Sequence, residues 1–137
     1  MKLGFVTAIL PELTFEDVLC FASVEGFSTV EVMCWPVGKA ERKYAGVTHI
    51  DVTAMTKTRA QDILAQCGDH GVGISALGFY PNALDPNPEV ARAAVAHLKK
   101  VIKAAPGSSE AKSAKILMTW AKEAKQLEES KKKKENE

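Results

Sequence analysis

Apolar and polar residues alternate along residues 26–35 in a way that indicates a β-strand. Gly26 ends the segment before it, and Pro36 stops the apolar run. Alternation predicts one face with Val30, Val32 and Cys34 and another with Glu31, Met33 and Trp35. Because both faces are mostly apolar, we expect both to be covered, as in a parallel sheet flanked by helices. The carboxylate of Glu31 then lies on a buried face, where it needs hydrogen-bonding partners or a role in a site.

Two further apolar runs predict strands on either side of this one in the sequence. The first covers residues 2–8 and ends before Pro11. The other covers residues 72–80 and is also apolar on both faces. A strand, a helix and a strand within about thirty residues form a βαβ unit, in which the two strands are parallel.

Amphipathic segments between these strands predict two helices. The first follows Thr14, a residue suited to cap the amino terminus of a helix, and ends at Gly26. The second begins at Thr58, where the spacing to Gln61 is that of a capping box, and ends before Gly71. The positions expected to be buried are Phe15, Val18, Leu19 and Ala22 in the first helix and Ala60, Ile63, Leu64 and Cys67 in the second.

A third helix is predicted after the last strand, because Asn87 can cap it and Pro88 suits the first helical position. Its inner side is expected to contain Ala91, Ala94, Leu98, Val101, Ile102 and Ala105. His70 and His97 lie on the predicted helices, and we expect structural roles for both. Beyond a break at residue 106, the pattern predicts an amphipathic helix over 106–129 and a charged tail over 130–137.

The connection between the second strand and the second helix is long and polar. It follows a strand, so it lies at the carboxyl end of the sheet, where ligands bind in barrels and open α/β sheets. Lys39, Arg42 and Lys43 could hold a sugar phosphate there, or could form a solvated loop face. His49 and Asp51 supply only two possible metal ligands, whereas protein metal sites use three or four.

The composition is that of a single globular domain, with 137 residues, 46% hydrophobic and 26% charged residues, and a net charge of +1. This charge gives no reason to expect nucleic acid as a partner, and no apolar run is long enough for a membrane span. The amino terminus does not have the layout of a signal peptide. Cys20, Cys34 and Cys67 are far apart in the sequence, so we expect buried thiols in a reducing cytoplasm.

Residues 1–105 resemble the xylose isomerase-like TIM-barrel family of sugar phosphate isomerases and epimerases. The segments that carry the resemblance are residues 1–7, 26–36, 71–82 and 97–102. The resemblance implies an α/β fold, a partial (β/α) TIM-barrel-like unit with about three parallel strands plus a C-terminal helix. A complete barrel has eight strands and about 250 residues. We therefore expect an amino-terminal portion of the family's fold, truncated and inactive alone.

The resemblance also implies where the family's chemistry lies. A divalent metal, Mn²⁺ or Mg²⁺, and the catalytic carboxylates belong to later strands, so we expect no cofactor in this chain and leave its catalytic residues unassigned. Glu31 matches the acidic residue of the second strand, and Trp35, Phe79 and Tyr80 match positions near the substrate. These four are the candidate residues for binding a sugar or sugar phosphate.

Two functions follow as alternatives. The first is an isomerase or epimerase, which moves a proton beside a sugar carbonyl. The second is a non-catalytic remnant that self-associates or binds a partner, because three parallel strands leave two open sheet edges. A homo-oligomer is possible under either alternative.

Overall fold

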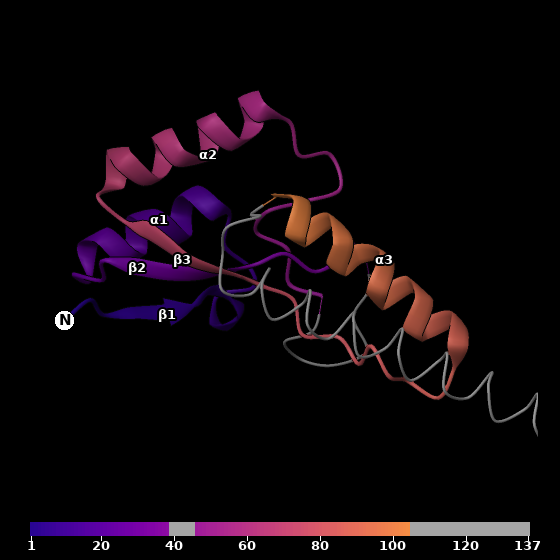
Figure 1. The fold of residues 1–137 in the computed structure, drawn as a ribbon. Helices are drawn as coiled ribbons and strands as arrows, with labels where there is room; N and C mark the ends of the chain where they lie inside the picture. The colour runs from indigo at the N-terminus through magenta and orange to yellow at the C-terminus, as the bar shows by residue number, and fades with distance from the viewer. Residues whose placement is uncertain (39–45, 105–137) are drawn as a thin grey trace, which may run out of the picture.

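The computed structural model describes residues 1–38 and 46–104 (Figure 1). Its strands are β1 (Gly4–Val6), β2 (Thr29–Met33) and β3 (Gly73–Gly78), which form one parallel sheet in the order β1-β2-β3. An α/β unit with three parallel strands is therefore confirmed. The helix expected over 106–129 and the tail over 130–137 lie outside the described residues.

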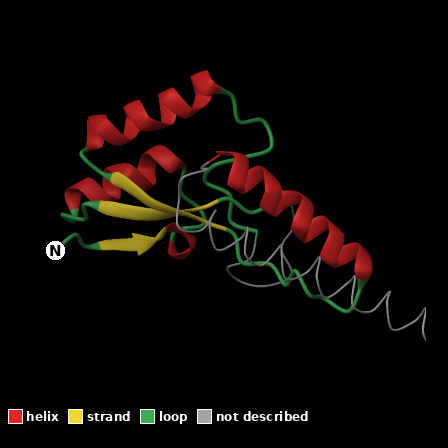
Figure 2. Cartoon of the chain, in the orientation of Figure 1, coloured by secondary structure: helices red, strands yellow, loops and turns green. Residues whose placement is uncertain are grey.

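Three helices and one short turn of 3₁₀-helix connect or follow the strands: η1 (Thr7–Ile9), α1 (Phe15–Val24), α2 (Lys57–His70) and α3 (Pro88–Ala104). Figures 1 and 2 show α1 and α2 on the same side of the sheet, with α3 beside the carboxyl ends of the strands. None of these helices, within the described part of the chain, has the length and apolar character needed to cross a membrane.

The core lies between the sheet and its helices. The β2 face made by Val30, Val32 and Cys34 is completely buried, as expected. The cluster around it takes Val18, Leu19 and Ala22 from α1, Ile63 and Cys67 from α2, Leu77 from β3, and Leu98, Val101 and Ile102 from α3. Burial of these side chains is the main stabilising contribution, at about 25 cal/mol per Å² of apolar surface.

The first strand is shorter than the expected span of residues 2–8. After Val6 the chain turns into η1, which the hydrogen bond from the Leu10 amide to the Thr7 carbonyl closes at 3.0 Å. The buried Thr7 hydroxyl accepts a hydrogen bond from the Met33 amide at 3.0 Å. The hydroxyl of Thr7 thus takes the place of a backbone carbonyl as the acceptor for the Met33 amide. The apolar pattern of the segment does not reveal this.

The cap of the second helix was predicted two residues too late. α2 begins at Lys57, and its cap is Thr56, whose hydroxyl accepts a hydrogen bond from the Arg59 amide at 3.1 Å. Thr58 therefore lies inside the helix. The carboxyl end is as expected, because Gly71 adopts the left-handed conformation with φ 65°.

Two apolar side chains expected in the interior are exposed. Leu64 of α2 is 64% exposed, because among the described residues β3 is an edge strand and no further strand lies beyond it. Cys20 is exposed because it lies on α1 away from the inward-facing positions Val18, Leu19 and Ala22. Cys34 and Cys67 are buried, as expected.

The second face of β2 is covered in part by the described residues. Only its carboxyl end is buried, where Met33 packs with Ala8, Val47 and Trp35. Glu31, in the middle of this face, is partly exposed. Alternation assigns residues to two faces, but whether an element covers a face depends on distant parts of the chain.

The described part of the long connection is packed against the sheet. Thr48 pairs with Cys34 in an antiparallel bridge, and the His49 amide donates to the Met33 carbonyl at 2.9 Å. Val47, Ile50 and Val52 are buried. From residue 46 onward, the connection therefore extends the core, whereas Lys39, Arg42 and Lys43 lie outside the described residues.

Candidate functional site

Glu31 lies in the middle of a row of side chains that crosses the sheet. Its neighbours in the row are Val6 on β1 and Ala76 on β3. The strand pairing shifts between Val30, which pairs with Ile74, and Glu31, so Ser75 has no paired residue on β2. The Ser75 hydroxyl donates a hydrogen bond to the Val30 carbonyl at 3.1 Å. The shift brings Ala76, instead of Ser75, opposite Glu31.

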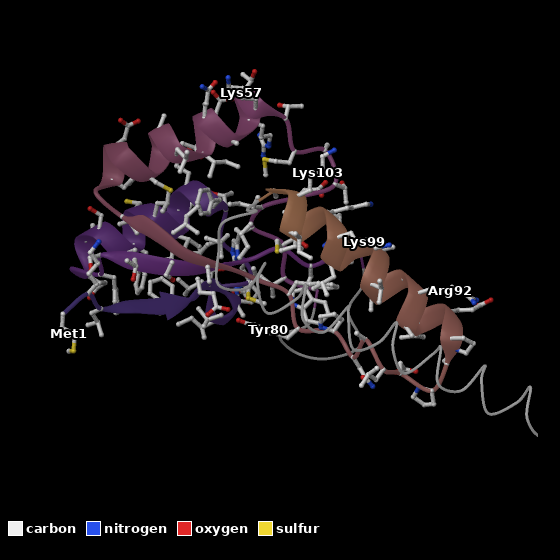
Figure 3. All side chains as sticks on the ribbon, in the orientation of Figure 1. Met1, Lys57, Tyr80, Arg92, Lys99 and Lys103 are labelled. Carbon is white, nitrogen blue, oxygen red and sulfur yellow. The ribbon has the colours of Figure 1, made fainter. Side chains whose placement is uncertain are left out.

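Tyr80 lies two residues beyond the end of β3, and its hydroxyl donates a hydrogen bond to Oε1 of Glu31. Tyr80 is 58% exposed, and Figure 3 shows it below the carboxyl end of the sheet. The two residues are separated by 49 positions in the sequence. The parallel pairing of β2 and β3 therefore joins two of the expected binding residues into one polar pair.

Gly78 leaves the space in which this carboxylate lies. It pairs with Met33, and a Cβ atom at this position would approach Sδ of Met33 to 2.7 Å and Oε1 of Glu31 to 3.0 Å. Gly78 is not among the residues expected at the site from the sequence. A glycine near the end of a strand was the available signal, because it often marks close approach of another group.

Trp35 and Phe79, the other two expected binding residues, belong to an aromatic cluster at the same end of the sheet. Their ring centroids lie 4.9 Å apart with an edge-to-face arrangement. Phe79 also packs on His97 at 4.5 Å and is itself buried. Its ring is thus part of the core at this end of the sheet.

His97 connects α3 to this cluster. Its Nε2 atom lies 2.8 Å from the Cys34 carbonyl oxygen, and its side chain is buried. The structural role expected for His97 is confirmed. His70 is also engaged locally, with Nδ1 2.9 Å from the Gln66 carbonyl oxygen one helical turn earlier.

The indole N–H of Trp35 is buried and has no acceptor among the described residues. Its backbone is well held, because the Thr48 hydroxyl donates to the Trp35 carbonyl at 2.7 Å. An unsatisfied buried donor is costly, typically by about 1–3 kcal/mol, unless a ligand or water completes it. Trp35 therefore brings an unused donor to the carboxyl end of the sheet.

The charge of Glu31 also acts on the opposite face of β2. Burial, and secondarily the negative charge of Glu31, raise the pKa of the Cys34 thiol to about 12. Sγ of Cys34 donates to the Gly78 carbonyl at 3.4 Å. Cys34 is thus protonated at neutral pH and is unsuited to nucleophilic chemistry.

His49 and Asp51 are engaged in separate local interactions. Nε2 of His49 lies 3.1 Å from the Leu10 carbonyl oxygen, and burial lowers the pKa of this imidazole. Asp51 accepts hydrogen bonds from the Thr53 hydroxyl and amide, at 2.6 and 2.8 Å, which lower the pKa of its carboxyl. Across residues 1–38 and 46–104, no group of three or more His, Cys, Asp or Glu side chains could hold a metal ion.

The arrangement at this end of the sheet offers two features for a ligand. The Glu31 carboxylate can accept hydrogen bonds, and the Tyr80 hydroxyl fixes its position. These features suit a small molecule with several hydroxyl groups. Comparison of the sequence with known protein families finds no matching family, and comparison with curated proteins finds no matching protein.

Proposed function

We propose that this chain is a sugar phosphate isomerase- or epimerase-like protein that binds a sugar or sugar phosphate at the carboxyl end of its sheet. The observation that carries the proposal is the hydrogen bond from the Tyr80 hydroxyl to the carboxylate of Glu31, a partly exposed residue. A carboxylate accepts hydrogen bonds from neighbouring sugar hydroxyls, and a tyrosine ring offers an apolar surface to the C–H groups of the sugar.

The proposed role of Glu31 and Tyr80 is to bind and orient the ligand. Isomerases and epimerases of this kind move a proton beside a carbonyl group, using a base and often a metal ion that polarises the carbonyl oxygen. The resemblance described above implies that the metal ligands and catalytic carboxylates come from strands beyond the third. For this chain, the proposal is therefore binding of the substrate class, with turnover dependent on such further residues.

Titration calorimetry of the full chain with a pentose phosphate and a hexose phosphate tests this proposal. We expect Glu31→Gln to weaken binding roughly tenfold, because hydrogen bonds to a charged group contribute about 1.5–3 kcal/mol. Tyr80→Phe should weaken binding less, since it removes only the group that fixes the carboxylate. Glu89→Gln, in the first turn of α3, is the matched control and should bind as the unmodified chain does.

Two results would contradict this function. One is the absence of binding heat with either sugar phosphate at millimolar concentration. The other is equal affinity in the Glu31→Gln variant, with a melting temperature that shows the variant to be folded.

We also propose that the protein works in the cytoplasm. Cys20, Cys34 and Cys67 are all free thiols, and an exposed free thiol such as Cys20 is most compatible with a reducing compartment.

A second candidate function, self-association or binding of a protein partner, is favoured by the edge of β1. Among the described residues, β1 has a neighbouring strand on one side only. Leu3 and Ile9, which flank β1, are 58% and 59% exposed. An exposed apolar edge strand is a site for pairing with another chain.

Light scattering on the full chain separates this candidate from the first. We expect a mass above that of the monomer, which Leu3→Lys should lower by placing a charge beside the open edge. Val90→Lys, at an exposed apolar residue of α3, is the control and should leave the mass unchanged. A monomeric unmodified chain would contradict the self-association.

A further inference from the structure

A small apolar hollow lies on the other side of the sheet, away from Glu31. It has a volume of about 210 Å³ and lies between α2 and β3. Ile63 and Leu64 form its α2 wall, and Ile74 and Leu77 form its β3 wall. Leu64 is the side chain that was expected in the core and is exposed at this hollow, so the apolar surface here has no protein partner among the described residues.

A larger, polar hollow adjoins the first. Its volume is about 440 Å³, and Lys57, Lys100 and Lys103 line it. Met55, Ala60 and Ala104 line both hollows, so the two share a wall. Figure 3 shows Lys57 at the start of α2 and Lys103 near the end of α3, on either side of this region.

Positive charge is concentrated at the larger hollow. Lys57 and Lys103 are both exposed, and the amino terminus of α2 adds the partial positive charge of its free amide groups. Lys100 is partly offset by Asp51, whose carboxyl pKa is lowered mainly by Thr53 and to a smaller extent by His97 and Lys100. An apolar hollow thus adjoins a hollow lined by three lysines, and the two have lining residues in common.

We propose that these adjoining hollows bind a small anionic amphiphile, with its apolar part between α2 and β3 and its carboxylate or phosphate among the lysines. The apolar hollow of about 210 Å³ has room for about seven heavy atoms, if each water-sized group takes about 30 Å³. A short acyl chain or a single aromatic ring has this size. The lysine-lined hollow, at about 440 Å³, is within the usual range of ligand sites and accommodates the hydrated head group.

This site is independent of the one around Glu31 and Tyr80. It lies on the helix-covered side of the sheet, where Ile74 and Leu77 are aligned with Val30 and Val32 of β2. A ligand here would bridge α2, β3 and the end of α3.

Titration calorimetry of the full chain with octanoate tests the proposal. Octanoate has a chain of the required size and one negative charge. We expect binding that is roughly tenfold weaker for octan-1-ol, which lacks the charge, and for acetate, which lacks the apolar chain. Equal binding of octanoate and octan-1-ol, or no heat with octanoate, would overturn the proposal.

Two charge reversals identify the site. Lys57→Glu and Lys103→Glu should each weaken octanoate binding roughly tenfold, whereas Lys99→Glu, at an exposed position of α3 outside both hollows, should not change it. Ala60→Leu should also weaken binding, because Ala60 lines both hollows and the larger side chain would fill part of their volume. Equal losses of octanoate affinity in Lys99→Glu and Lys103→Glu would overturn the proposed position of the ligand. They would indicate an effect of the overall charge of the protein.

Discussion

Gly4 and Gly73 lie on either side of Thr29 in the sheet, yet they differ in the space available for a side chain. A Cβ atom at Gly4 would collide with the backbone carbonyl and the hydroxyl of Thr29. At Gly73 the nearest atom, the Ser28 carbonyl oxygen, would lie 3.8 Å away, an ordinary contact. The first glycine is thus required by close approach of two strands, and the second is not.

We therefore expect Gly4→Ala to lower the free energy of unfolding by about 1–3 kcal/mol, the usual cost of overpacking. Gly73→Ala is the matched control and should stay within about 0.5 kcal/mol of the unmodified chain. Urea denaturation measures both. Equal urea midpoints for the two variants would contradict this expectation. They would mean that β1 can move away from β2 at Gly4 without a decrease in the free energy of unfolding.

The sequence suggested Glu31, Phe79 and Tyr80 as ligand-binding residues but did not indicate which of their side chains are buried. Glu31 and Tyr80 form a polar pair, whereas Phe79 lies in the core with His97. Alternation places Phe79 and Tyr80 on opposite faces of an extended chain. It does not determine which of the two faces is exposed, because that depends on the position of α3.

At the scale of elements, α2 shows how local signals compete for a helix start. Thr56 and Thr58 both precede a helical pattern, and the spacing from Thr58 to Gln61 favours the later residue. The structure uses Thr56, whose hydroxyl accepts from the Arg59 amide. Buried Val52 and Ile50 anchor the preceding segment and so determine where the chain enters the helix.

This difference gives a direct test. Thr56→Ala should lower the free energy of unfolding by about 1 kcal/mol, the typical contribution of a helix cap. Thr58→Ala should change it by less than about 0.5 kcal/mol, because Thr58 is exposed inside the helix. The urea midpoints of the two single variants show which threonine caps the helix. A larger decrease in the free energy of unfolding for Thr58→Ala would indicate that Thr58 is the cap, as the sequence alone suggested.

At the scale of the whole molecule, His49 links the packing of the long connection to the stability of the fold. Its Nε2 atom bonds to the Leu10 carbonyl oxygen, and burial holds its pKa below the ordinary value of 6.5. The unfolded chain therefore binds a proton at a higher pH than the folded chain does. By linkage, stability is highest above pH 6.5 and is lost as the pH falls below it.

We expect the urea midpoint of unfolding to decrease as the pH is lowered from 7.5 to 5.5. The His49→Gln variant should show a smaller decrease. The carboxyl groups of Asp17 and Asp51 do not contribute in this range. Their pKa values are lowered from 3.8, so their stabilisation is lost only as the pH falls through still lower values. An identical pH dependence in the His49→Gln variant would exclude this histidine as the cause.

The sequence by itself determined the three strands, the three helices, and the caps at Thr14, Gly71 and Asn87. Each depends on side chains within about four positions of one another, so the local pattern contains the necessary information. The tertiary structure alone decided the contacts between distant residues. It brought Tyr80 to Glu31 across 49 positions and His97 to Cys34 across 63, and it left Leu64 exposed beside an edge strand. These contacts depend on strand register and on how helices pack, which arise only when all the elements assemble.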